Sequence, residues 1–212
     1  FSSDKFNKGN IKKFENNKLD TGINHEKEST THISIVDKYG NAVALTSSIE
    51  FAFGSGITVG GFFLNNQLTD FSFLNKDSLG AEIANSVFPG KKPRSSMSPT
   101  FIFDKSTKKL LGVIGSPGGS RIICYVARVI FEILYLEISP DQAVNNVHMC
   151  SRNKFTEIED DSNNKKLIHY LTKKKHSIKV KKMTSGLNII WHQNNVWQGI
   201  ADPRREGYAL GN

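Results

Sequence analysis

The sequence has little cysteine and no long apolar run. Its two cysteines, Cys124 and Cys150, form no CxxC pair. We expect Cys124 in the core; a disulfide between the two is compatible with the sequence but not required by it. The longest apolar stretch, residues 122–138, contains Arg128 and Glu132, so it predicts an amphipathic helix and not a membrane span. No His, Cys and Asp residues are spaced as metal ligands, and we expect neither a metal nor a cofactor.

Aromatic residues are missing from the basic runs, which argues against a nucleic-acid site. The formal net charge is +8, and the lysines are scattered apart from runs at residues 173–175 and 181–182. Such runs are typical of a solvated face. A nucleic-acid-binding module is a remote alternative, and the salt dependence of binding would test it.

A recognisable signal peptide is also missing, and the sequence begins with Phe1 and not with methionine. We therefore expect a processed chain or a fragment. Its 212 residues are 38% hydrophobic and 23% charged, which is ordinary for a globular protein and enough for one core. Residues 1–28 are polar and rich in lysine and asparagine, and they predict an exposed tail.

What the sequence does contain is a predicted hairpin with threonine at its head. Residues 30–36 alternate between apolar and polar side chains, residues 38–41 form a turn, and residues 42–48 return as a second strand. A threonine that begins a buried strand suits an N-terminal-nucleophile hydrolase, in which the hydroxyl attacks and the freed α-amine is the base. Thr30 and Thr31 are nearly equal candidates on this pattern, and an ordinary hairpin is the plain alternative.

The remaining pattern predicts alternating strands and helices without an internal repeat. Residues 62–64 read as a short buried strand, and residues 71–94 form a long connection of the kind that is usually functional. Ser139 is placed to cap a short helix. Further strands are predicted at residues 99–104, 110–115, 155–158, 177–180, 187–191 and 196–200, and a further helix at residues 165–174.

Four segments together resemble the small subunit of γ-glutamyltranspeptidases. They are Thr-Thr-His with Gly-Asn-Ala-Val, Leu-Asn-Asn-Gln with Asp-Phe-Ser, Pro-Arg-Ser-Ser-Met-Ser-Pro-Thr, and Gly-Ser-Pro-Gly-Gly-Ser-Arg. Their order and most of their spacing match the family, from about residue 30 to residue 207. The resemblance implies an α/β (α+β) fold of the N-terminal-nucleophile type, an αββα sandwich of which this chain supplies about half.

The resemblance also implies a division of the chain and a partner. Residues 1–29 would be the tail of the large subunit before the processing site, and residues 30–212 the small catalytic subunit. The large subunit from the same precursor would complete a heterodimer and supply an arginine that clamps the substrate carboxylate. A periplasmic or secreted location is expected from the family, with no membrane span in this chain.

The resemblance also implies a role for the nucleophile and for each residue near it. Cleavage between Ser29 and Thr30 would leave Thr30 as the nucleophile, and Thr31 is then structural. Ser48 aligns with a family threonine whose hydroxyl supports the nucleophile's amine. His32 is assigned a structural role, because the freed amine already supplies the base. Arg204 is expected to form structural ion pairs.

The resemblance implies that polar residues of two segments hold the donor. Glu50, Gln67 and Asp70 would bind the α-ammonium of a γ-glutamyl substrate, because an ammonium donates three hydrogen bonds. Ser95 and Ser96 would donate hydrogen bonds to its α-carboxylate. Taken singly, the first three are ordinary surface residues, and the serine pair is an ordinary turn.

Gly118 and Gly119 lie where a predicted strand becomes a helix. Two adjacent N–H groups at a helix N-terminus can form an oxyanion hole. A tight turn and a phosphate site are the alternatives, although the Lys-Ser/Thr of a phosphate loop does not follow.

The expected activity is transfer of a γ-glutamyl group from glutathione or another γ-glutamyl amide to water or an amino acid. Rivals on the same fold are a poly-γ-glutamate depolymerase and a β-lactam acylase. They stay open because residues 71–94 are shorter than the family's lid and contain no tyrosine. A non-catalytic fragment without its large subunit is the third alternative.

Overall fold

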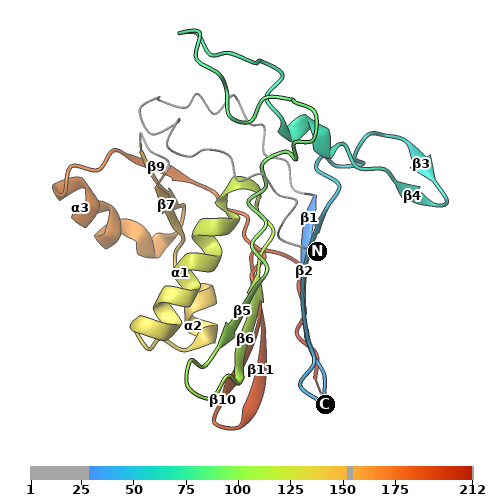
Figure 1. The fold of residues 1–212 in the computed structure, drawn as a ribbon. Helices are drawn as coiled ribbons and strands as arrows, with labels where there is room; N and C mark the ends of the chain where they lie inside the picture. Colours follow the sequence, from blue (N-terminus) through green and yellow to red (C-terminus); the bar gives the residue numbers. More distant parts are fainter. Residues whose placement is uncertain (1–28, 152–154, 212) are drawn as a thin grey trace.

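A computed structural model describes residues 29–151 and 155–211. The predicted tail, residues 1–28, lies outside them. The described elements form three layers: helices α1 and α2, a four-stranded sheet, and a two-stranded hairpin on the other side of that sheet (Figure 1). This arrangement is the expected half of an αββα sandwich. No helix among the described residues is long and apolar enough to cross a membrane.

The hairpin consists of β1 (Thr30–Val36) and β2 (Ala42–Ser48), as predicted. The strands are antiparallel, and Thr30 lies opposite Ser48. Asp37 closes the turn, because its carboxylate accepts hydrogen bonds from the backbone of Tyr39 and Asn41, both at 2.8 Å. The side-chain alternation of a strand then decides which residues point toward the second sheet and which point away from it.

The hairpin exposes an apolar outer face. Its four large aliphatic side chains there are 45% to 51% exposed: Ile33, Ile35, Val43 and Leu45. They pair across the hairpin, Ile33 opposite Leu45 and Ile35 opposite Val43. Among the described residues no third strand extends this hairpin.

The central sheet has the strand order β11-β10-β6-β5. Its strands are β5 (Thr100–Phe103), β6 (Leu110–Gly115), β10 (Asn188–Gln193) and β11 (Val196–Ala201), all antiparallel to their neighbours. The hairpin is fastened to this sheet at Ser34, whose hydroxyl donates to the Asn188 carbonyl at 3.1 Å. The Ser34 N–H donates to the Asn188 side chain at 3.3 Å.

The core lies between the central sheet and the helices α1 (Ile122–Tyr135) and α2 (Pro140–Asn145). Ile114 and Ile189 of the sheet pack with Ile122 and Val129 of α1, and all four are at most 1% exposed. Burying each such side chain contributes roughly 1.5–3 kcal/mol. Ser139 caps α2 as predicted, because its hydroxyl accepts from the Gln142 N–H at 3.3 Å.

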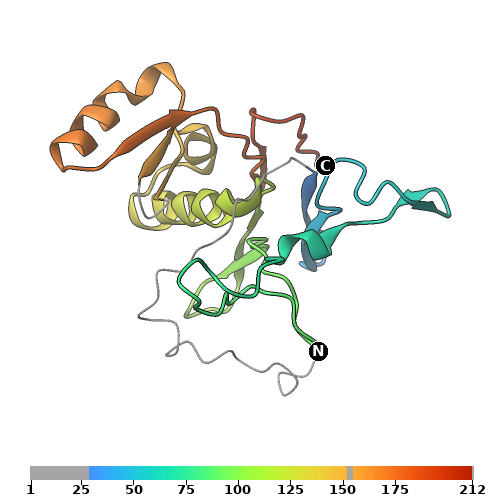
Figure 2. The same ribbon diagram turned by 90° about the horizontal axis from the view of Figure 1, so that it is seen from above.

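A third, smaller sheet extends the fold beyond α1. It contains β7 (Met149–Ser151), β8 (Thr156–Glu159) and β9 (Ile178–Lys181), with α3 (Lys165–Lys173) connecting β8 to β9 (Figure 2). Strand β7 was not predicted. A disulfide joins Cys124 of α1 to Cys150 of β7, which decides the pairing that the sequence left open. Cys150 is buried, whereas Cys124 is half-buried.

An arm projects from the body after β2. It contains β3 (Thr58–Val59), β4 (Phe62–Phe63) and the 3₁₀ turn η3 (Gln67–Asp70) (Figure 1). The prediction that residues 62–64 are buried was wrong: Phe62 is 75% exposed and pairs only with Val59 across a two-stranded ribbon. Residues 71–99 follow without a regular strand or helix.

Candidate active site

Thr30 and Ser48 lie side by side at the open end of the hairpin. The Thr30 hydroxyl donates to the Ser48 hydroxyl oxygen at 3.1 Å, and the Glu50 N–H donates to the same oxygen at 3.0 Å. Thr30 points to the same side of β1 as buried His32, toward the central sheet, whereas Thr31 points outward and is exposed. The geometry therefore favours Thr30 over Thr31 as the nucleophile.

Ser29 is tied to the chain that follows β2, because its hydroxyl donates to the Glu50 carbonyl. Glu50 adopts a φ of 71°. This left-handed conformation costs a non-glycine residue about 1–2 kcal/mol. It turns the chain at Glu50 and brings the backbone on both sides of the Ser29–Thr30 bond close to the end of β2.

Glu50, Gln67 and Asp70 form one cluster. The Gln67 amide donates to the Asp70 carboxylate, and Glu50 lies within hydrogen-bonding reach of both. Burial and the neighbouring Asp70 raise the pKa of Glu50 to about 7, although Gln67 and Arg94 oppose the rise. Two carboxyl groups and an amide oxygen therefore lie together, and they can accept hydrogen bonds from an ammonium.

A neighbour that the sequence reasoning missed holds this cluster in place. The Asn85 amide donates to the Asp70 carbonyl at 2.6 Å, and its oxygen accepts from the Arg94 N–H at 3.0 Å. Asn85 therefore links the turn that carries Asp70 to the segment that leads to Ser95. Its position within an irregular connection gave no periodic signal.

Ser95 and Ser96 lie outside this hydrogen-bonded cluster. Ser95 is exposed, and its hydroxyl accepts from the Met97 N–H at 3.3 Å. Ser96 is half-buried, and its carbonyl accepts from the Ser98 hydroxyl at 2.8 Å. Within residues 29–151 and 155–211 no hydrogen bond joins either serine to Thr30 or Glu50, so their substrate role stays a prediction.

Gly118 and Gly119 form the junction between β6 and the helical turn η4 (Gly119–Arg121), which leads into α1. Both have positive φ, 129° and 59°. A side chain at Gly118 would come within 2.6 Å of the Tyr125 ring. Glycine is needed at Gly118 because of this backbone conformation and this close approach. The predicted strand-to-helix turn is confirmed, and its role as an oxyanion hole stays a prediction.

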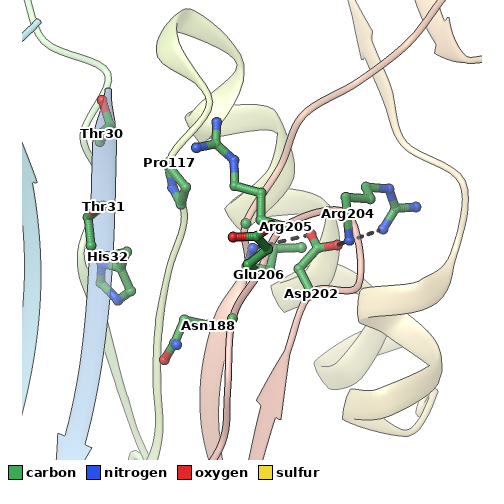
Figure 3. Close-up of a pocket in the computed structure, with 12 residues that line it drawn as sticks. Thr30, Thr31, His32, Pro117, Asn188, Asp202, Arg204, Arg205 and Glu206 are labelled. Atoms are coloured by element: carbon green, nitrogen blue, oxygen red, sulfur yellow. Dashed lines mark hydrogen bonds and ion pairs between the residues drawn. The ribbon is translucent and has the colours of Figure 1, made fainter. Parts of the chain in front are cut away.

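A cavity of about 490 Å³ opens beside the nucleophile candidate. Thr30, Thr31 and His32 line one side, the turn at residues 202–207 lines the other side, and Pro117 lies between Thr30 and Arg205 in the view (Figure 3). Thr30 is the only one of the predicted site residues that lines this cavity. Sequence reasoning missed the contribution of the turn at residues 202–207.

His32 has the surroundings of a structural residue. It is 6% exposed, and its ring nitrogens lie 2.8 Å from the Thr46 hydroxyl and 3.1 Å from the Ser34 hydroxyl. A side chain at Gly115 would collide with the imidazole, so the ring packs directly on β6. Burial lowers the pKa of His32 to about 4, which keeps the ring neutral at physiological pH.

Arg204 forms structural ion pairs, as expected. Its guanidinium donates to Glu159 at 2.5 and 2.8 Å and to Asp202 at 3.2 Å. Burial alone would raise the pKa of Asp202, but hydrogen bonds from His148 and Ser185 and the charge of Arg204 lower it well below its usual range. This network fixes the turn at residues 202–207 against β8.

The layers, the hairpin headed by threonine and the strand-to-helix glycine turn together define the N-terminal-nucleophile hydrolase class. A family model described as gamma-glutamyltranspeptidase matches residues 3–212, so the chain belongs to this family. It resembles the glutathione hydrolase proenzyme of Bacillus subtilis, with 35% identity over 86% of this chain and 30% of the relative. The corresponding Escherichia coli proenzyme is 45% identical over 57% of this chain and 22% of the relative. The chain thus spans less than a third of the length of these curated relatives.

Solved structures agree with this assignment. A mutant of Helicobacter pylori γ-glutamyltranspeptidase superimposes with a TM-score of 0.72 at 33% identity, covering 82% of this chain and 100% of that one. The Bacillus anthracis transpeptidase enzyme CapD gives a TM-score of 0.64 at 26% identity, covering 86% and 99%. The predicted fold class is therefore confirmed.

Proposed function

We propose that this chain is the catalytic part of a γ-glutamyl transferase and hydrolase that acts on glutathione and related γ-glutamyl amides. The observation that carries the proposal is the placement of Thr30. Thr30 lies at the head of β1, and its hydroxyl donates a hydrogen bond to Ser48. The carboxylate cluster begins at Glu50, two residues after Ser48. The names of the relatives, glutathione hydrolase proenzymes, support the same substrate class.

In the proposed donor site, Glu50, Gln67 and Asp70 bind the α-ammonium of the γ-glutamyl group. A buried ammonium needs acceptors for all of its donors, and this cluster supplies carboxylate and amide oxygens. Ser95 and Ser96 would donate hydrogen bonds to the α-carboxylate.

The proposed reaction has two halves. The Thr30 hydroxyl attacks the γ-carbonyl carbon, its proton passes to the Thr30 α-amine, and the leaving amine departs with that proton. The N–H groups of Gly118 and Gly119 stabilise the oxyanion that forms during attack. Water or an acceptor amine then attacks the γ-glutamyl ester, and the Thr30 oxygen leaves and regains its proton. Before the attack, Ser48 holds the Thr30 hydroxyl in position.

This chemistry requires a free α-amine on Thr30, so we propose self-cleavage of the Ser29–Thr30 bond. The Thr30 hydroxyl would attack the Ser29 carbonyl, and water would open the resulting ester. Residues 1–29 would then remain with the large subunit, and residues 30–212 would form the small subunit of the heterodimer. The word proenzyme in the relatives' names supports a two-part precursor.

A periplasmic or secreted location belongs to the same proposal. The disulfide between Cys124 and Cys150 supports it, because disulfides persist in oxidising compartments and are rare in the cytosol.

The test is maturation of the full-length precursor. We expect a fragment whose N-terminal sequence begins at Thr30 and an enzyme that cleaves a chromogenic γ-glutamyl anilide. Thr30→Ala should abolish both, whereas Thr31→Ala should leave the fragment's start unchanged. A fragment that begins at Thr31, or a precursor that stays intact and inactive, would contradict the proposal.

A further inference from the structure

Helix α1 and strand β7 lie side by side and are joined by three links on one face of the helix (Figure 1). The disulfide between Cys124 and Cys150 is the central link. Two arginines make the others, three positions before and four positions after Cys124, so all three side chains share that face. The two links are a 2.6 Å ion pair of Arg121 with Glu157 and a 3.2 Å hydrogen bond from Arg128 to His148. The disulfide is therefore the covalent member of this joint.

The joint supports the glycine turn of the candidate active site. Tyr125 follows Cys124 in α1, and its ring packs against the His148 ring with the centroids 4.4 Å apart. The same ring lies against the backbone of Gly118, where an added Cβ would come within 2.6 Å of it. The packing of α1 against the segment that leads into β7 therefore helps to fix the ring that lies under Gly118.

The joint also supports the turn that lines the cavity beside Thr30. His148 Nε2 lies 2.6 Å from the Ser185 hydroxyl, and that hydroxyl donates to the Asp202 carboxylate. Asp202 lines the cavity. His148 and Ser185 are fully buried, so this chain of hydrogen bonds has no contact with water. A shift of β7 relative to α1 would be felt at both places.

The two cysteines of the bridge differ in their access to solvent. Cys150 is 3% exposed, whereas Cys124 is half-buried and follows Ile123, which is 54% exposed. Thiol–disulfide exchange requires a thiolate to reach one sulfur of the bridge. Cys124 is therefore the end of the bridge that is open to a small thiol.

We propose that Cys124 is a modification site for small thiols such as glutathione, and that opening the bridge there slows the chemistry at Thr30. The glutathione thiolate attacks Cys124 Sγ, a new S–S bond forms, and the bond to Cys150 breaks. Cys150 leaves as a thiolate and takes up the proton that glutathione lost. A second glutathione can then release glutathione disulfide and leave two protein thiols, so the bridge gains two electrons. The choice of glutathione rests on the proposed function, whereas the reactivity of the bridge does not.

The opened protein keeps the ion pair and the hydrogen bond of the joint, so it should remain folded. What it loses is the fixed spacing between α1 and β7 that holds the Tyr125 ring under Gly118. The N–H groups of the glycine turn are then aimed less well at the oxyanion. Such a change lowers kcat more than it raises KM.

The experiment treats the enzyme matured from the full-length precursor with glutathione. One sample is alkylated with iodoacetamide, which traps freed thiols, and is then desalted. Peptide mass mapping should find glutathione on Cys124 and the alkyl group on Cys150. With a saturating γ-glutamyl anilide, kcat should be about tenfold lower, less than the loss expected for removing an oxyanion donor outright.

A second sample is desalted without alkylation, and enzyme treated with iodoacetamide alone is the control. In the second sample the Cys150 thiolate can attack the mixed disulfide, release glutathione and close the bridge again, so kcat should recover. The control should keep its full kcat, because the described residues contain no free cysteine.

Two matched variants test which sulfur is reactive. Cys150→Ala and Cys124→Ala both lack the bridge, so they differ only in the thiol that remains. With glutathione disulfide, Cys150→Ala should form a mixed disulfide at Cys124. This should be at least about tenfold faster than the reaction of Cys124→Ala at Cys150.

A bridge that stays closed in glutathione would overturn the proposal, and so would faster labelling of Cys150 than of Cys124. A mixed disulfide that leaves kcat unchanged would overturn the link to the active site. If the single variants do not fold, mapping and kinetics of the wild-type enzyme still decide the matter. A wild-type enzyme that does not cleave the anilide overturns the proposed function, whereas the mass mapping still tests the modification site.

Discussion

The protonation of Glu50 should govern how well the enzyme binds its donor at different pH values. The pKa of Glu50 is raised to about 7 by burial and by Asp70. At pH 6 about nine-tenths of the protein therefore holds a proton on Glu50. Binding an ammonium favours the ionised carboxylate, so that proton must leave. The protonation of Glu50 alone should lower the kcat/KM for a γ-glutamyl donor about tenfold per pH unit below 7.

Glu50→Gln separates this effect from other titrations. Glutamine keeps the size and the hydrogen-bonding capacity of the side chain, but it carries no titrating proton. At pH 8 the variant lacks a charged acceptor for the ammonium, which costs about 1.5–3 kcal/mol, or roughly 10–150-fold in kcat/KM. At pH 5 the protonation of Glu50 has itself cost the wild-type enzyme about 100-fold in kcat/KM, so the two enzymes should become similar.

The assay is kcat/KM for a γ-glutamyl anilide from pH 5 to pH 9 on both matured enzymes. The Thr30 α-amine, with a usual pKa of about 7.7–8.0, titrates in both of them, so it cancels in the ratio. A wild-type to variant ratio that is the same at every pH would refute the reasoning. It would show that Glu50 does not titrate with donor binding.

Three further predictions follow from the same geometry. Asp70→Ala should lower kcat/KM for γ-glutamyl donors far more than Lys173→Ala, and equal effects would remove Asp70 from the site. Gly119→Val, at a φ of 59°, should lower kcat by about 10²-fold in matured enzyme with a smaller change in KM; a change in KM alone would place the oxyanion donors elsewhere. Burial lowers the pKa of His32 from 6.5 to about 4. As the pH falls, the unfolded chain therefore binds a proton at His32 before the folded chain does. The free energy of unfolding should fall by at most about 3 kcal/mol from pH 6.5 to pH 4. A urea midpoint no lower at pH 4.5 than at pH 7.5 would contradict this.

The sequence was most informative where local pattern and chemistry coincide. Alternation predicted the hairpin of β1 and β2 and placed Thr30 at its head, because a two-residue period leaves few choices of register. The glycine pair predicted the turn from β6 into the helix, because only glycine suits the conformation of Gly118 beside Tyr125. The separations along the chain from Ser48 to Asp70 are short enough for a turn-rich segment to bring them together.

The sequence was least informative where distant segments meet. Arg205 reaches the cavity only because β10 pairs with β6 on one side and with β11 on the other, and no local pattern encodes the pairing of β10 with β6. Cys124 and Cys150 lie 26 residues apart, and their bridge depends on how α1 packs against β7. The apolar residues of the arm were read as buried because composition predicts burial, whereas the described residues leave Phe62 exposed.

The apolar outer face of the hairpin has a practical consequence for handling this protein. The outer face of the two-stranded ribbon carries a row of exposed apolar side chains, Ile33, Ile35, Val43 and Leu45, and no third strand extends the ribbon within the described residues. Such a ribbon is a template for pairing with copies of itself. Residues 30–212 produced alone should therefore self-associate and bind hydrophobic dyes. Co-production with the upstream part of the precursor should yield a soluble, dye-negative particle, so the choice of expression boundary decides whether any of the kinetics can be measured.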